Sequence, residues 1–190
     1  MQVSMNDREN ETRLADLFER QAVQDCLLRA ALGNDLQDAL LWKSAYWPDA
    51  TEDHGWYHGN AHAFIDETVP LLLDTMDETW HQVGNMIVRI DGDRACAQSY
   101  FFAYCRTKTA DDGRGDLFAG GRCVDRLERR SDEWRIAARI TKGDWVRQAT
   151  GSADWSKPVL QGYVPKYGLR ALDDPFWRVF GRRLHPQGDQ

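Results

Sequence analysis

His81 is the residue whose type and position most directly suggest catalysis. It lies near the start of TWHQVGNMIVRI, residues 79–90, a segment rich in β-branched and apolar residues that is typical of a β-strand. Histidine suits the role of a general base because its unperturbed pKa, about 6.5, is close to neutral pH. A histidine at a strand end can equally be a hydrogen-bonded structural residue. The residue type by itself leaves both interpretations open.

A second group of histidines recurs every four residues in HGWYHGNAH, at His54, His58 and His62. That spacing places metal ligands on one face of a helix. Gly55 and Gly59 interrupt the segment, however, and no carboxylate pattern such as H-E-x-x-H accompanies it. We therefore expect no metal site and no cofactor, and we interpret these histidines as surface or pocket-rim residues.

Arg139 is the cation that we expect in or near a binding site. Strand alternation predicts that it lies on the face opposite Ile136 and Ile140. It can form a structural bridge with Asp125, or it can polarise a substrate oxygen or leaving group inside a cavity. The sequence does not decide between these two roles.

Tyr57 and Tyr100 are candidate hydrogen-bond donors to a substrate. The alternative for each is an ordinary core aromatic whose hydroxyl is satisfied within the protein. The chain also contains eight tryptophans in 190 residues. Such a content of large rings indicates a thick core or a pocket that binds a flat, apolar molecule.

The first half of the chain has helical patterns. Apolar residues fall on one face between residues 13 and 32, and Gly33 follows. A second helix is predicted over residues 36–47, closed by Pro48; Asp35 can cap it, and Asp38 is expected in its first turn. Asn60 is expected to cap a third helix, which Pro70 should kink or stop.

The second half has strand patterns. Two antiparallel hairpins are predicted, one turning at DGDR (residues 91–94) and one at SDE (residues 131–133). Helices followed by an antiparallel meander indicate an α+β architecture. We assign residues 1–150 to one domain. Residues 151–190, rich in Gly, Pro and aromatics, are expected to pack on that domain or on a neighbouring subunit.

The composition narrows the function classes. The formal net charge is −6, which argues against a nucleic-acid or anionic-membrane partner. No apolar run approaches the roughly 20 residues of a membrane span, and the first residues lack the character of a targeting segment. We therefore expect a cytoplasmic protein that acts on a small molecule.

Three stretches, in this order, carry a resemblance to a known family: ALGNDLQDALLWKSAYWPDA, HQVGNMIVRIDGDRACAQSY and GGRCVDRLERRSDEWRIAAR. Over roughly residues 12–147, the chain resembles the SnoaL-like family of the nuclear transport factor 2-like superfamily. The resemblance implies a cone-shaped, cystatin-like α+β fold, in which N-terminal helices pack on a strongly curved, mostly antiparallel sheet around a cavity. The most similar branch contains scytalone dehydratase, bile-acid 7α-dehydratase and hexachlorocyclohexane dehydrochlorinase.

The resemblance also implies residue roles. Asp35 corresponds to an aspartate that orients a catalytic histidine, and His81 corresponds to that histidine. Ala30 departs from the bile-acid enzyme, which has a tyrosine there, so leaving-group assistance from this position is excluded. The implied function is a cofactor-free lyase, most simply a dehydratase, acting on a hydrophobic cyclic small molecule. The family also implies a homo-oligomer, either a trimer or a dimer.

Two other functions fit the same residues. An isomerase or cyclase can use the same base without expelling a leaving group, and the mass of its product would distinguish it. A non-catalytic binding or accessory subunit, like the small subunits of ring-hydroxylating dioxygenases, also has this fold. A fold alone does not determine which of these functions applies.

Overall fold

The computed structural model describes residues 5–108 and 115–150, so the predicted C-terminal extension lies outside the described residues. Helices and strands follow in the order α1 (Met5–Asp35), α2 (Ala39–Ser44), β1 (Tyr46–Asp53), β2 (His58–Asn60), α3 (Ala61–Thr75), β3 (Met76–Asp91), β4 (Arg94–Thr107), β5 (Gly115–Arg130) and β6 (Glu133–Thr150). Within the described part of the chain, no helix is long and apolar enough to cross a membrane.

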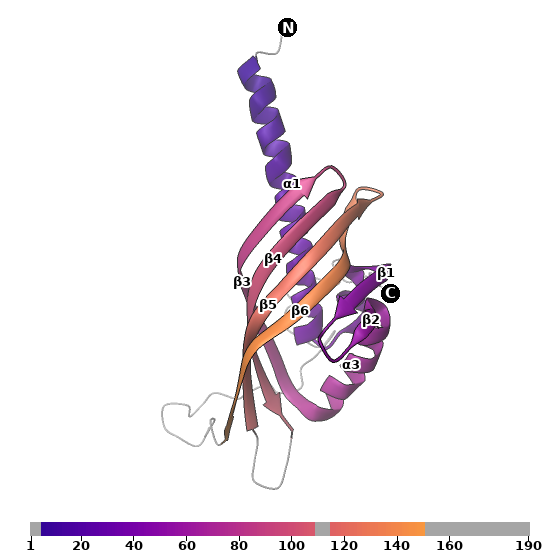
Figure 1. Cartoon of the computed structure of the whole chain (residues 1–190), viewed down its shortest axis with the longest axis vertical. Helices are drawn as coiled ribbons and strands as arrows, with labels where there is room; N and C mark the ends of the chain where they lie inside the picture. Colours follow the sequence, from indigo (N-terminus) through magenta and orange to yellow (C-terminus); the bar gives the residue numbers. More distant parts are fainter. Residues whose placement is uncertain (1–4, 109–114, 151–190) are drawn as a thin grey trace, which may run out of the picture.

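One curved sheet and a layer of helices form the body of the protein (Figure 1). The six strands have the order β2-β1-β6-β5-β4-β3, and every pairing is antiparallel except that of β1 with β6. Helix α1 packs against β3 and β6, and its N-terminal half projects beyond the sheet (Figure 1). The predicted α+β class with a curved, mostly antiparallel sheet is confirmed.

The C-terminal half of α1 is helical and buried for the reason that the sequence indicates. Val23, Cys26, Leu27 and Ala30 follow the spacing of one helical face, and each is at most 2% exposed. They join a core that includes Ile136 of β6. The helix is longer than predicted at both ends, since it begins at Met5 and continues to Asp35.

Helix α2 is shorter than predicted. It begins after Asp38, whose side chain accepts hydrogen bonds from the backbone N–H groups of Leu40 and Leu41. Asp38 is therefore the N-cap and not a first-turn residue, and Asp35 does not cap this helix. The helix ends before Tyr46 because β1 begins there and pairs with β6. The predicted end at Pro48 is wrong.

Helix α3 begins as predicted but does not stop at its proline. The Asn60 side chain accepts a hydrogen bond from the Ala63 N–H, which makes Asn60 the N-cap. Pro70 lies inside the helix, which continues to Thr75. Because Phe64 and Val69 anchor the helix in the core, the single backbone bond lost at the proline does not end it.

Both predicted hairpins are present, and the second contains a bulge that changes which residues face inward. Ile136 pairs with Leu127, whereas Ala138 pairs with the preceding residue, Arg126, so Ala137 is the extra residue in β6. As a result Ile136 is fully buried while Ile140 is 51% exposed. The predicted alternation, which placed these two isoleucines on one face, is wrong beyond the bulge.

Candidate active site

Asp35 and His81, separated by 46 residues in sequence, are in direct contact. The Asp35 Oδ1 atom lies 2.6 Å from Nδ1 of the His81 ring, and Asp35 Oδ2 accepts the His81 backbone N–H at 3.0 Å. A carboxylate that accepts from Nδ1–H fixes the tautomer in which Nε2 carries the lone pair. Within the described residues Nε2 has no hydrogen-bond partner, and the ring lines a pocket. This arrangement has the geometry of an oriented general base.

Two local features bring the end of α1 against β3. The Thr79 hydroxyl donates to the backbone carbonyls of Asn34 and Asp35, at 3.4 and 3.2 Å. These carbonyls belong to the last turn of the helix, where no intrahelical donor remains. Gly33 allows α2 to cross at close range, because a Cβ at this position would lie 2.5 Å from the Trp42 backbone. Both contacts hold Asp35 opposite the strand that carries His81.

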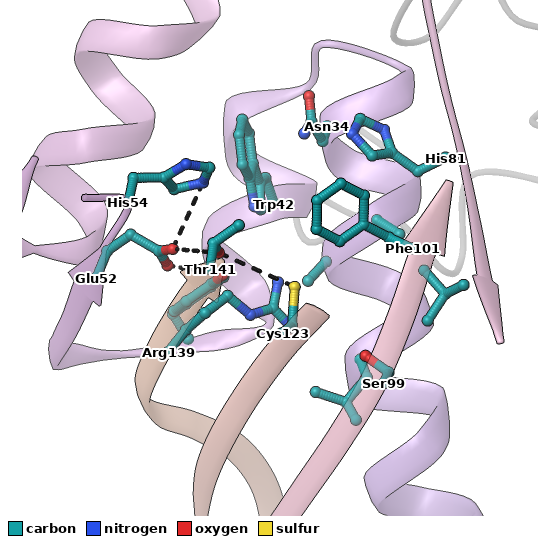
Figure 2. A pocket seen from close by; sticks show the side chains of 15 residues that line it. Asn34, Trp42, Glu52, His54, His81, Ser99, Phe101, Cys123, Arg139 and Thr141 are labelled. Carbon is teal, nitrogen blue, oxygen red and sulfur yellow. Dashed lines mark hydrogen bonds and ion pairs between the residues drawn. The ribbon is translucent and has the colours of Figure 1, made fainter. Parts of the chain in front are cut away.

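The pocket lies between the helices and the inner face of the sheet, with an empty volume of about 650 Å³ that includes its open mouth. Figure 2 shows His81 on one side and Glu52 with His54 on the other. Apolar side chains dominate the lining, including Leu27, Ala30, Ala31, Trp42, Val83 and Phe101. A lining that is mostly apolar in surface, with the polar groups of Glu52, His54 and His81 on it, suits an apolar small molecule.

On the side of the pocket opposite His81, two ionisable residues of the lining and a buried aspartate form a row across three adjacent strands. Glu52 of β1 is the register partner of Arg139 of β6, which in turn is the register partner of Asp125 of β5. Arg139 forms a bidentate ion pair with Asp125, at 2.6 and 3.2 Å. The predicted structural bridge is thus present, and Arg139 also lines the pocket.

Glu52 is buried, at 2% exposed, and lines the pocket. Its Oε2 accepts from the Tyr46 hydroxyl at 3.2 Å, and its Oε1 accepts from the Thr141 hydroxyl at 3.1 Å. Burial disfavours the charged form and raises the pKa of Glu52 to about 7, although Arg139 acts in the opposite direction. The carboxyl is therefore partly protonated at neutral pH.

His54 lies beside Glu52 but is not a cation at neutral pH. Its Nε2 is 3.7 Å from Glu52 Oε1, and its ring stacks on Phe64 with centroids 4.8 Å apart. Burial, and then the positive charge of Arg139, lower the pKa of His54 to about 4. Burial also raises the pKa of the neighbouring Cys123 thiol, so the pocket contains no activated thiolate there.

The two predicted tyrosines do not line this pocket. The Tyr57 hydroxyl donates to the Asn60 carbonyl at 2.8 Å, within the β1–β2 region. Tyr100 lies between Ser99 and Phe101, which do line the pocket, so strand alternation directs it to the other face. Tyr100 is 45% exposed there. For Tyr57, the satisfied-hydroxyl alternative matches the observed contacts.

The three regularly spaced histidines lie on different elements. His54 follows β1 and lines the pocket, His58 contacts Asp53 at 3.1 Å, and His62 in α3 lies 3.3 Å from the Tyr46 carbonyl. The part of the chain that the structure describes contains no group of three or more His, Cys, Asp or Glu residues arranged to hold a metal ion.

Glu52 is not among the residues that the sequence predicts for the site, and His54 is predicted only as a surface or pocket-rim residue. Both line the pocket. A usable signal exists, because Ala50, Glu52 and His54 alternate with the outward residues Thr51 and Asp53. The inner face of this strand therefore combines a small residue with two titratable ones. The missing information was that β1 pairs with β6, which turns that face into a pocket wall.

The fold and the pocket define a class of protein, the cone-shaped α+β proteins with a cystatin-like sheet. The chain matches the family model of the SnoaL-like domain over residues 15–140. It therefore belongs to the SnoaL-like family, within the nuclear transport factor 2-like superfamily. The predicted family is confirmed. A comparison with curated proteins finds no match.

Solved structures with the same fold include an enzyme and a candidate enzyme of related description. A type 2 hexachlorocyclohexane dehydrochlorinase (LinA) is 17% identical, with a TM-score of 0.66, over 77% of this chain and 98% of that one. A candidate scytalone dehydratase from Novosphingobium aromaticivorans is 15% identical, with a TM-score of 0.63, over 73% and 97%. A variant of a Mycobacterium tuberculosis protein of unknown function is 21% identical, with a TM-score of 0.59, over 90% and 99%. At these identities the likeness establishes the fold.

Proposed function

We propose that the protein is a cofactor-free lyase that eliminates a small leaving group from a hydrophobic cyclic molecule. His81 abstracts a proton from carbon through Nε2, and Asp35 orients the ring and stabilises the imidazolium that forms. The observation that carries the proposal is the 2.6 Å contact between Asp35 and His81 at the edge of an apolar pocket. The dehydrochlorinase and the candidate dehydratase with this fold give it further support.

The test uses two fused-ring ketones as probes, one with a hydroxyl and one with a chloride β to the carbonyl. Both have an acidic C–H next to the carbonyl, and both are apolar enough for the pocket. We expect elimination of water or hydrogen chloride, detected by mass spectrometry above the spontaneous background. In His81→Gln, kcat/KM should fall by about 10²- to 10⁴-fold, the usual contribution of a general base.

His58→Gln is the matched control, because its side chain is 65% exposed and does not line the pocket. It should react like the wild type. A product of unchanged mass that has incorporated deuterium from D₂O would instead identify an isomerase with the same base. Equal rates in the wild type and His81→Gln would overturn the proposal and favour the accessory-subunit alternative.

We also propose that the protein is a homo-oligomer, a dimer or a trimer. Val124 and Ile140 are register partners on neighbouring strands, and they are 44% and 51% exposed. Adjacent exposed apolar residues on a sheet face are typical of a surface that another protein covers. Sedimentation equilibrium should give a mass two or three times that of the chain, and a monomer at all concentrations would contradict this expectation.

A further inference from the structure

The pocket contains a second titratable group that the proposed base does not use. Glu52 lines the pocket on the side opposite His81 (Figure 2). Both of its oxygens are held, one by the Tyr46 hydroxyl and one by the Thr141 hydroxyl. A carboxyl held so firmly in a buried position has a defined direction into the pocket, as a group that transfers a proton requires.

Glu52 lacks the cation that usually accompanies a buried carboxylate. The guanidinium of Arg139, its register partner on β6, is bound through two hydrogen bonds to Asp125. Among the described residues, the only ionisable nitrogen within 4 Å of Glu52 is that of His54, at 3.7 Å. The low pKa of His54 keeps this ring neutral, so it does not supply the missing charge. The neutral acid is therefore populated near pH 7 and is the main form below it, because burial raises the pKa of Glu52 to about 7.

We propose that Glu52 is the general acid that protonates the departing oxygen, so that the substrate is an alcohol and the elimination is a dehydration. This inference rests on the proposed lyase function. A hydroxyl group is a poor leaving group unless it receives a proton, whereas a halide leaves as an anion and needs none. A neutral carboxyl opposite a base is thus useful for loss of water and unnecessary for loss of halide.

The proposed step balances. Nε2 of His81 takes the proton from the substrate carbon, the electrons of that C–H bond form the new C=C bond, and the C–O bond breaks. The leaving oxygen takes the Glu52 proton and departs as water. The products are the alkene, water, an imidazolium at His81 and a carboxylate at Glu52. Exchange with solvent then moves one proton from the imidazolium to the carboxylate and restores the starting state.

The surroundings of Glu52 also suit the carboxylate that the step leaves behind. The hydroxyls of Tyr46 and Thr141 already donate to its two oxygens, and both bonds strengthen when the acceptor becomes charged. Arg139, on the neighbouring strand, lowers the energy of the charged form. Asp125 offsets part of this effect, so the protonated acid remains populated at neutral pH.

The experiment compares Glu52→Gln with His81→Gln on the β-hydroxy and β-chloro ketone probes. Gln keeps the shape of Glu52 and its acceptor for a hydroxyl but has no acidic proton. We expect kcat/KM for the β-hydroxy probe to fall by about 10²- to 10³-fold in Glu52→Gln, within the range of general acid catalysis. The β-chloro rate should change little. His81→Gln should lose both activities.

Glu67→Gln, the same change at an exposed position of α3, is the matched control and should react like the wild type with both probes. An equal effect of Glu52→Gln on the two probes, with both still lost in His81→Gln, would overturn the role of Glu52 and leave the lyase intact. Retention of both activities in His81→Gln would instead overturn the proposed function.

A measurement without substrate provides an independent readout. Infrared difference spectra between the wild type and Glu52→Gln should contain the band of a protonated carboxyl group at pH 6, and this band should disappear at alkaline pH. Absence of the band at pH 6 would show that Glu52 is already ionised, and the proposed acid would be ruled out.

Discussion

Each side of the pocket contains one carboxylic acid and one histidine, but the two pairs differ in how the carboxyl is hydrogen-bonded. On one side, Asp35 accepts two hydrogen bonds from His81, one from the ring Nδ1–H and one from the backbone N–H. On the other side, Glu52 accepts two hydroxyls and its nearest histidine nitrogen, on His54, is 3.7 Å away. The first carboxyl orients a base, and burial raises the pKa of the second to about 7.

The two carboxyls differ in their hydrogen-bond donors and in their burial, and not in the kind of acid that they are. The Asp35 and His81 side chains are 18% and 20% exposed, so solvent contributes to the stabilisation of charge there. Glu52 is 2% exposed, and its charged form is disfavoured. His81, oriented by one carboxyl, and Glu52, the other carboxyl, can serve as the base and the acid of one reaction.

Among the variants that test this difference between the two sides, Asp35→Asn should have the largest effect on activity. An amide can present its N–H to Nδ1 and thereby stabilise the wrong tautomer, in which Nε2 carries the proton. We expect kcat/KM for the β-hydroxy ketone to fall by about 10²- to 10⁴-fold. Asp25→Asn, an exposed position on the same helix, should have no such effect. Equal activity of the two variants would mean that Asp35 has no orienting role.

The pH dependence of stability separates Glu52 from His54. The pKa of Glu52 rises from 4.5 to about 7 on folding, so its contribution to the free energy of unfolding is full below pH 4.5 and is lost as the pH rises to 7. The pKa of His54 falls from 6.5 to about 4, so its contribution is full above pH 6.5 and is lost as the pH falls to 4. The two effects oppose each other in nearly the same pH window, so they partly cancel in the wild type.

Single variants should expose these opposing slopes. The unfolding free energy of Glu52→Gln relative to wild type should rise by about 3 kcal/mol between pH 4.5 and 7. That of His54→Gln relative to wild type should fall between pH 4 and 6.5, by a smaller amount because the His54 side chain is 32% exposed. Urea unfolding over a pH series measures both. If neither difference in unfolding free energy changes with pH, the pKa shifts of Glu52 and His54 would be contradicted.

Gly33→Ala should disturb the packing of α1 against α2, on the side of the pocket that holds Asp35. The added methyl would lie 2.5 Å from the Trp42 backbone, so α1 and α2 must separate. We expect the free energy of unfolding to fall by about 1–3 kcal/mol, as for other overpacked sites, despite the better helix propensity of alanine. Gly84→Ala is the control, because nothing lies within 4 Å of its added Cβ. Comparable stabilities of the two variants would exclude the close-approach role of Gly33.

Thr79→Val should have the smallest effect. It removes the hydroxyl that donates to the carbonyls of Asn34 and Asp35 but keeps the branched shape that a strand favours. The expected loss is about 1 kcal/mol in the free energy of unfolding, measured by urea denaturation. Thr51→Val, at an exposed position of β1, should be nearly neutral. An equal loss in both variants would indicate a general effect of the substitution.

Features that depend on near neighbours in the chain can be predicted from the sequence alone. The buried stripe of α1 follows from the spacing of Val23, Cys26 and Leu27, and the cap of α3 follows from the side chain of Asn60. The order of helices before hairpins follows from a change of hydrophobic period. These features are predictable because their stabilising contacts lie within a few residues, or because one face of an element is apolar.

The site itself depended on longer-range information. The pairing of Asp35 with His81 came from a family resemblance, because no local pattern connects residues 46 positions apart. Only the tertiary structure revealed Glu52 as part of the pocket, since β1 must first pair with β6 and set it beside Arg139. Likewise, only the bulge at Ala137 explains which β6 residues face inward. Strand pairing and bulges are chosen by the packing of the whole sheet, and that energy is not contained in any one segment.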